Sequence, residues 1–160
     1  MTNHCGSCTA CCRVFAIPAL EKPAGKWCDH CDIGVGCKIY EQRPSMCSEF
    51  ECLWLNSRNR DDIREHIGDE LRPDRCKVVF HPSTNPEVMS ATLLPGSPDA
   101  WRRKGVKKLI DRMVDSGYRV VVGLPAATRK IMFDQDGQHD VQMTAPDKDG
   151  MQWSIPEEVQ

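Results

Sequence analysis

Ten cysteines stand out in this chain of 160 residues, and nine of them fall between Cys5 and Cys52. Thiolates bind zinc and the irons of iron–sulfur clusters, whereas two oxidised thiols join as a disulfide. The cysteine-rich segment therefore predicts one of two chemistries, a metal site or a disulfide scaffold.

The spacing of the cysteines favours metal ligation. Cysteines two residues apart in a tight loop aim their sulfurs at one point, as a tetrahedral ion or a cubane cluster requires. Disulfides need an oxidising compartment, and the first residues lack the basic-then-apolar profile of a secretion signal, so we expect a cytoplasmic protein. The ten cysteines are Cys5, Cys8, Cys11, Cys12, Cys28, Cys31, Cys37, Cys47, Cys52 and Cys76.

Spacing leaves the identity of the metal open. Zinc sites use paired C-x-x-C units, and Cys5 and Cys8 with a second pair would satisfy that rule. Ferredoxin loops also open with C-x-x-C-x-x-C, but here Cys12 directly follows Cys11 where those loops have a three-residue gap. Because adjacent side chains point in different directions, we expect one of Cys11 and Cys12 to serve a second centre or to close the first from another side.

Two motifs in order along the chain carry a family resemblance. The first, Cys5 to Arg13, reads C-x-x-C-x-x-C-C-R, and the second, Gly36 to Cys52, reads G-C-K-I-Y-x-x-R-P-x-x-C-x-x-F-x-C. Together they resemble the YkgJ-like, or CxxCxxCC, family of cysteine-cluster domains, which is described as chelating zinc or iron. The resemblance covers residues 5 to about 55.

The resemblance implies a set of eight metal ligands. Cys31 stands where relatives more often have an aliphatic residue, so it is an auxiliary ligand or a bystander, and Cys76 lies outside the pattern. The same module is similar to the cysteine-rich part of flagellin lysine N-methylases, which are considered iron–sulfur enzymes. That similarity favours an iron–sulfur cluster, of the 4Fe–4S type, over Zn²⁺. The implied ligands are Cys5, Cys8, Cys11, Cys12, Cys28, Cys37, Cys47 and Cys52.

A site rich in thiolates needs neighbouring donors that offset its negative charge. Arg13, Lys38 and Arg43 are the cations that we expect to supply them. His30, between Cys28 and Cys31, and His4, before Cys5, could ligate or donate a hydrogen bond to a ligand. A helix over residues 45–50, opened by Pro44, would present Cys47, and Cys52 reaches the same centre only if that helix ends between the two.

The rest of the chain predicts an α+β fold. Helices are expected over residues 60–67 and, as the one main helix, from the cap at 97–99 to Gly117. Strands are expected over 76–81, 87–94, 118–124, 129–133 and 140–144, with a hairpin turn at Asp136 and Gly137. The valine-rich run 118–124 predicts a central strand, and the tail from residue 146 is expected to dock at an edge or stay loose.

We therefore expect one compact domain over residues 1–160. Its cysteine-cluster lobe, stapled by metal, would span residues 1–56, and its α+β portion, a small mixed sheet with one main helix, residues 57–160. Cys76 would open the first strand as a small buried hydrophobic side chain.

Composition argues against several function classes. Hydrophobic residues make up 40% of the chain, charged residues 28%, and the net charge is −2, so overall charge recruits neither nucleic acid nor a membrane surface. The basic residues from Arg102 to Lys108 share their helix with acids, which indicates a solvated face. No apolar run is long enough to span a bilayer, and no phosphate-binding glycine loop or Cys–His–Asp set occurs.

Three functions fit these observations. The first is a metal-binding module that chelates iron or zinc and has a redox, metal-handling or partner-presenting role. The second is an iron–sulfur-dependent, methylase-like transferase that acts on a protein substrate. The third is a zinc module that binds protein or nucleic acid. In the first two the partner would be another protein, and no catalytic residue is assigned.

Overall fold

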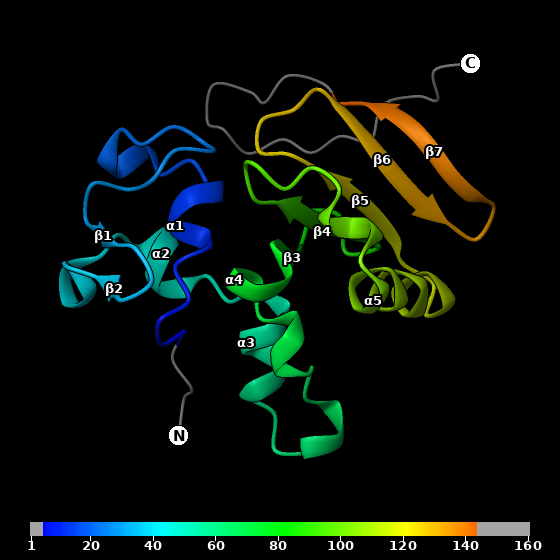
Figure 1. Cartoon of the computed structure of the whole chain (residues 1–160), viewed down its shortest axis with the longest axis horizontal. Helices are drawn as coiled ribbons and strands as arrows, with labels where there is room; N and C mark the ends of the chain where they lie inside the picture. The colour runs from blue at the N-terminus through cyan, green and yellow to red at the C-terminus, as the bar shows by residue number, and fades with distance from the viewer. Residues whose placement is uncertain (1–4, 144–160) are drawn as a thin grey trace.

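A mixed sheet of five strands forms the centre of the structure, a computed structural model that describes residues 5–143. The strands lie in the order β3-β4-β5-β6-β7, and they form one twisted layer (Figure 1). β4 and β5 run parallel, whereas the other neighbouring pairs are antiparallel. The strands are β3 (Val78–Pro82), β4 (Val88–Leu93), β5 (Arg119–Gly123), β6 (Arg129–Asp134) and β7 (Gly137–Gln142).

One long helix, α5 (Lys104–Asp115), connects the two parallel strands and covers one face of the sheet. Its apolar residues recur at helical spacing, so that Val106, Ile110 and Met113 are buried against the sheet. Gly117, with φ of +94°, follows the helix and lets the chain turn into β5. The expected α+β fold, with a small mixed sheet and one main helix, is confirmed.

The central position of β5 follows from its sequence. Three consecutive valines, Val120, Val121 and Val122, are buried although they alternate between the two faces of the sheet. A strand that is apolar on both faces belongs in the middle of a covered sheet, as the valine run predicted. The hairpin at Asp136 and Gly137 is also confirmed, between β6 and β7.

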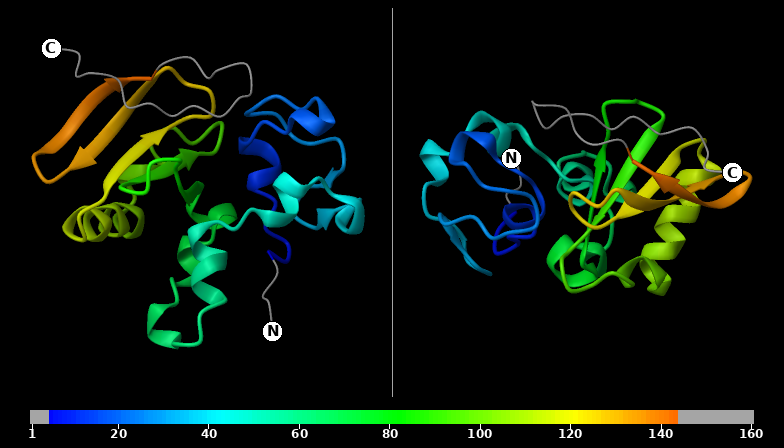
Figure 2. Two further views of the ribbon diagram at one scale, coloured as in Figure 1. Left: turned by 180° about the vertical axis from the view of Figure 1, so that it is seen from behind. Right: turned by 90° about the horizontal axis from the view of Figure 1, so that it is seen from above.

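Upstream of β3 the chain forms only short elements of two to six residues, joined by turns. The elements nearest the N-terminus form a separate lobe, coloured blue to cyan in Figure 1. Figure 2 shows that lobe beside the sheet in two further views. We call residues 5–56 the N-terminal lobe. The short elements are α1 (Cys11–Val14), η1 (Pro18–Leu20), β1 (Cys31–Asp32), β2 (Gly36–Cys37), η2 (Tyr40–Gln42), α2 (Ser45–Glu49), α3 (Leu53–Arg58), η3 (Ile63–Glu65), η4 (Asp69–Leu71) and α4 (Pro73–Cys76).

Several expected elements differ from the structure. The helix expected over 60–67 is wrong except for the single turn η3, because Ile63 is 76% exposed and anchors nothing. The first strand begins at Val78, since Cys76 ends α4 and Lys77 adopts the left-handed conformation with φ of +64°. The main helix is preceded by the separate turn η5 (Ala100–Arg102).

Two expectations cannot be compared with the structure. His4 and the tail from residue 146 lie outside the described residues. Within residues 5–143, no helix has the length and apolar character that crossing a membrane would require.

The N-terminal lobe packs against the sheet face opposite α5. Along β3, Val78 and Phe80 face α5, whereas Val79 and His81 face the lobe. The His81 ring contacts Phe15 edge-on at a centroid distance of 5.0 Å, and it lies 6.0 Å from the ring of Phe50. The sheet is therefore covered on both sides, and the lobe covers β3.

His81 is held in its neutral form at this contact. Because the carbonyl of Pro82 can only accept, His81 Nδ1–H donates to it at 3.1 Å, which leaves Nε2 to accept from the Thr92 hydroxyl at 3.0 Å. Burial lowers the pKa of His81 from 6.5 to about 4, and the charge of Lys130 acts in the same direction.

This pKa predicts a pH dependence of stability. Above pH 6.5 both states hold a neutral imidazole, whereas between about pH 6.5 and 4 only the unfolded state takes up the proton. The free energy of unfolding should therefore fall by about 3 kcal/mol as the pH drops through that window. Urea unfolding of the wild type and of His81→Phe should diverge there, because the phenyl ring cannot titrate. Parallel pH profiles for the two proteins would contradict this assignment.

Candidate metal centre

All ten cysteines lie within residues 5–143, and every one of them is a free thiol. No pair of cysteines in this part of the chain is joined as a disulfide. The structure sorts nine of the thiols into two groups inside the N-terminal lobe, and it puts the tenth, Cys76, elsewhere.

The first group lies against the sheet, and we call it the sheet-side group. Its four members line a small apolar hollow together with Phe50, Pro73 and Val79 of β3. A turn brings the first two together: the Cys8 amide donates to the Cys5 carbonyl at 3.1 Å, and Gly6 between them has φ of +58°. The members of the sheet-side group are Cys5, Cys8, Cys11 and Cys52.

The thiols of the sheet-side group raise each other's pKa. Burial raises the pKa of Cys5 to about 11, and the nearby Cys52 and Cys8 thiols act in the same direction. Burial also raises the pKa of Cys8 and of Cys52. Backbone amides oppose the shift: Cys8 accepts from Ala10 and Asp74, and Cys52 accepts from Leu55 and Trp54. Amide donors around a sulfur are the environment in which a thiolate is stabilised.

The second group lies farther from the sheet, and we call it the outer group. Two of its members, Cys31 and Cys37, face each other as paired residues of the β1–β2 hairpin. Cys28 joins them to the first motif, because its amide donates to the Cys12 carbonyl at 3.1 Å and its carbonyl accepts from the Cys31 amide at 3.0 Å. The members of the outer group are Cys12, Cys28, Cys31, Cys37 and Cys47.

The Cys11 and Cys12 side chains connect the two groups. Cys12 accepts a hydrogen bond from Cys11, which raises the pKa of Cys11 well above its usual value and lowers the pKa of Cys12 to about 6. Cys31 donates to Cys12 as well, and the charge of Lys22 also favours the Cys12 thiolate. Burial raises the pKa of Cys31 to about 12, with the charge of Cys12 acting the same way. Cys12 is thus the thiol of this lobe best set up to carry a negative charge.

Cys47 and Cys52 fall into different groups. α2 ends at Glu49, and Phe50 is extended before Cys52 caps α3, so the chain has the break that a shared centre would need although the two cysteines lie in different groups. The direction of the chain after that break carries Cys52 under β3, into the sheet-side group. Cys47 stays in the outer group, where burial raises its pKa and the charges of Cys12, Cys28 and Cys37 contribute.

A buried lysine that the sequence analysis missed neighbours the thiols. Lys22 is only 6% exposed, and its ammonium donates to the carbonyls of Arg13, Phe15 and Pro23. Burial lowers its pKa, and the charges of neighbouring thiols, first those of Cys28 and Cys12, oppose that shift. Lys22 therefore supplies the positive charge that a set of thiolates requires.

We expect the substitution Lys22→Met to destabilise the reduced protein by about 2–4 kcal/mol, because three carbonyls lose their donor. Lys26→Met is the matched control, since Lys26 is exposed and four residues away in sequence. Chemical unfolding of the three proteins under reducing conditions measures the difference. Equal stability of the two variants would show that the buried ammonium contributes nothing.

The cations and the histidine that the sequence analysis expected near the thiolates lie in different surroundings. Arg43 stacks on the ring of Tyr40 at 3.6 Å, and its charge lowers the pKa of Cys5 and of Cys47. Arg13 instead lies over Trp27 at 5.4 Å, beside a cavity described below. Lys38 is exposed, and His30 is half-buried next to the outer group.

Cys31 and Cys76 can also be assigned a place. Cys31 belongs to the outer group, so that group contains one thiol more than the resemblance implies. Cys76 is buried in the core between the sheet and α5, as expected for a small hydrophobic side chain, and its sulfur contacts the carbonyls of Leu71 and Val78. Burial raises the pKa of Cys76 to about 11.

The thiols of each group lie near one another, but they do not surround a common point as the ligands of a metal ion do. Within residues 5–143, no group of three or more His, Cys, Asp or Glu side chains has the geometry to hold a metal ion. The eight cysteines implied as ligands nevertheless divide evenly, with four in the sheet-side group and four in the outer group. Ligation would therefore require the thiols of each group to move closer together.

Comparison with known proteins adds no relative to this description. The chain matches no protein-family model, and no curated protein or solved structure is significantly similar to it.

Proposed function

We propose that this is a metal-binding cysteine-cluster protein with two centres, each held by four thiolates of the N-terminal lobe. The sheet-side centre would use Cys5, Cys8, Cys11 and Cys52, and the outer centre would use Cys12, Cys28, Cys37 and Cys47. One observation carries the proposal: cysteines from segments up to 47 positions apart gather as free thiols in two groups of at least four.

The surroundings of the thiols fit a bound cation. Most of these thiols have raised pKa values because burial and neighbouring thiols disfavour additional negative charge. A cation removes that penalty, since coordinating thiols lose their protons and the ion offsets their charge. Amide donors at Cys8 and Cys52 and the buried Lys22 ammonium would offset what negative charge remains.

Iron, as iron–sulfur clusters, is the metal that we favour, and zinc is the alternative. Both prefer thiolate ligands, and the resemblance to the YkgJ-like family and to flagellin lysine N-methylases favours iron. A bound cluster would supply one-electron transfer, whereas zinc would supply structural stability. Free thiols persist in a reducing compartment, so we place the protein in the cytoplasm. We expect its partner or substrate to be another protein.

Purification under strict exclusion of oxygen, followed by elemental analysis, tests the proposal. Iron–sulfur loading should give about eight irons and eight acid-labile sulfides per chain, with visible absorbance that bleaches on reduction. Zinc loading should give a colourless protein with about two ions per chain. Protein that contains neither metal, and acquires neither on reconstitution while remaining folded, would refute the proposal.

A methylase-like transferase remains the second candidate function. Within the described residues no catalytic set has been assigned, so this candidate depends on the resemblance alone. Binding of S-adenosylmethionine to the metal-loaded protein would support it, and calorimetry measures that binding directly.

A further inference from the structure

A cavity of about 370 Å³ lies where the N-terminal lobe meets the sheet. Its walls come from the first cysteine motif, from the loop before β1 and the turn between β1 and β2, from α4 and Lys77 after it, and from the loop after β4. The volume falls in the range of small-molecule sites, near its lower end. None of the thiols of either group lines it, so it is separate from the candidate metal centres.

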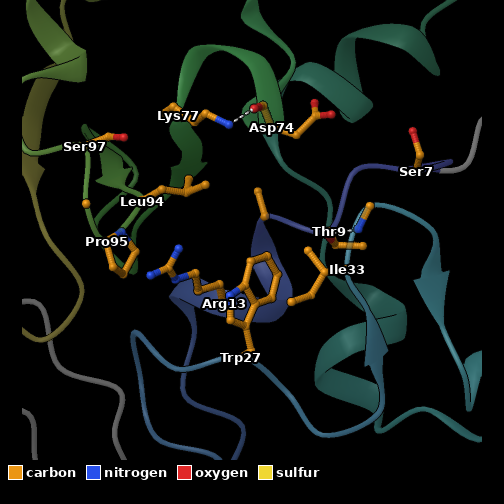
Figure 3. A pocket seen from close by; sticks show the side chains of 13 residues that line it. Ser7, Thr9, Arg13, Trp27, Ile33, Asp74, Lys77, Leu94, Pro95 and Ser97 are labelled. Atoms are coloured by element: carbon orange, nitrogen blue, oxygen red, sulfur yellow. Dashed lines mark hydrogen bonds between the residues drawn. The ribbon is translucent and has the colours of Figure 1, made fainter.

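The cavity has an excess of positive charge. Its only titratable lining residues, among those the structure describes, are Arg13, Asp74 and Lys77. The Asp74 carboxylate is already bound by Arg72, whose Nε and terminal nitrogen each donate to it at 2.6 Å. The two cations therefore face the cavity without a carboxylate of their own. Figure 3 shows the Arg13 guanidinium and the Lys77 side chain bordering the same space.

Arg13 has donor capacity that the protein leaves unused. Its Nε is buried from solvent and has no hydrogen-bond partner within residues 5–143. A buried guanidinium N–H without an acceptor is costly, and native proteins pair almost all such groups. Lys77 donates once, to the Asp74 carbonyl, which leaves two further N–H groups on its ammonium.

Apolar surfaces complete the lining. Trp27, Leu94 and Pro95 also line the cavity, and the Arg13 guanidinium lies over the Trp27 ring at 5.4 Å from its centroid (Figure 3). An aromatic face, two aliphatic side chains and two cations form the lining expected for a ligand with an apolar body and an anionic end. Bare inorganic anions would leave the apolar part of the cavity without contacts.

We propose that this cavity binds a small organic anion, with a carboxylate or phosphate group on Arg13 and Lys77 and an apolar body against Trp27, Leu94 and Pro95. Guanidinium groups bind both kinds of oxyanion through charge-assisted hydrogen bonds. The lining contains no thiol, so the anion would not bind at the candidate metal centres themselves, but the cavity needs a folded N-terminal lobe because Arg13 and Trp27 belong to it.

Titration of the protein with phenyl phosphate and with benzoate tests this inference, and benzyl alcohol serves as the uncharged probe of the same shape. Trp27 should report binding through its fluorescence, and calorimetry should give the affinity. We expect at least one anion to bind with a dissociation constant below about 1 mM, and the alcohol to bind about tenfold more weakly. The tighter anion identifies the head group.

Two substitutions assign binding to the cavity. Arg13→Gln and Lys77→Gln should each weaken anion binding about tenfold, because each removes one charge. Arg102→Gln is the matched control. Arg102 is an exposed arginine that stacks on Trp101 and does not line the cavity. Lys77 is remote in sequence from every implied ligand, so its variant tests the cavity without altering the cysteine motifs.

The outcomes separate this inference from the proposed metal centres. Titrations should be run on protein whose lobe is folded and whose metal content is measured, because Arg13 and Trp27 belong to the N-terminal lobe. Metal-loaded protein that binds no anion would overturn this inference alone, whereas metal-free protein that stays folded and binds the anion would overturn only the proposed function. Absence of anion binding below about 10 mM, equal binding of the alcohol, or unchanged affinity in Arg13→Gln and Lys77→Gln would each overturn the inference.

Discussion

Cys47→Ser is expected to remove the outer metal centre and to leave the sheet-side centre loaded, so that bound metal falls by about half. Cys8→Ser should do the converse. A serine hydroxyl does not replace a thiolate for zinc or for an iron–sulfur cluster, and a centre that loses one of four ligands loses most of its affinity. The two residues lie in separate groups, which is why the losses should be partial and complementary. Elemental analysis of each variant measures the remainder.

The control for these variants is Cys76→Ser, which should retain all bound metal. Cys76 lies in the core between the sheet and α5, and a serine there can donate to the Leu71 and Val78 carbonyls that its sulfur contacts. Cys31→Ser should also retain most of the metal, because Cys31 is not one of the four outer-group thiols that we propose as ligands. Total loss of metal in both Cys8→Ser and Cys47→Ser would show that the thiols hold one shared centre instead of two.

The sheet could be predicted from the sequence because its signals are local. The valine run of β5, the turn at Asp136 and Gly137, and the apolar spacing of α5 each determine an element without reference to distant residues. The spacing of Ile63 and Ile67 also predicted a helix, over residues 60–67, and that prediction is wrong. Ile67 packs on the core, whereas Ile63 is exposed. Periodicity over two positions does not show whether a surface is available to cover them.

The candidate site could be predicted only in part. Spacing indicated a helix opened by Pro44 that lies close to α2, but the expectation that Cys11 and Cys12 point in different directions is wrong, because their side chains are hydrogen-bonded to each other. Spacing gave no indication that Cys52 joins Cys5 and Cys8, because that depends on the course of the chain under β3. Lys22 carries no local signal at all: it is buried because the chain folds back so that Lys22 pairs with Ile17.

Removal of the metal should unfold the N-terminal lobe while the sheet and α5 stay folded. The lobe has no element longer than six residues, and helices and hairpins this short are not stable by themselves in water. Structural zinc contributes about 10–16 kcal/mol in zinc-finger peptides, and a metal bound in this lobe would likewise supply folding free energy to it. The sheet and α5 keep their own core, built around Ile110, Val120 and Phe80.

Amide hydrogen exchange before and after treatment with a strong chelator measures this effect. The Cys28 and Cys31 amides, which hold the outer group together, should lose at least about a hundredfold in protection, whereas the amides of β5 should keep theirs. Residues of β3 that face the lobe, Val79 and His81, should show an intermediate response because they lose only their cover. Return of the metal should restore protection of the lobe. Unchanged exchange at Cys28 and Cys31 after complete removal of the metal would mean that packing on β3, and not the cation, holds the lobe together.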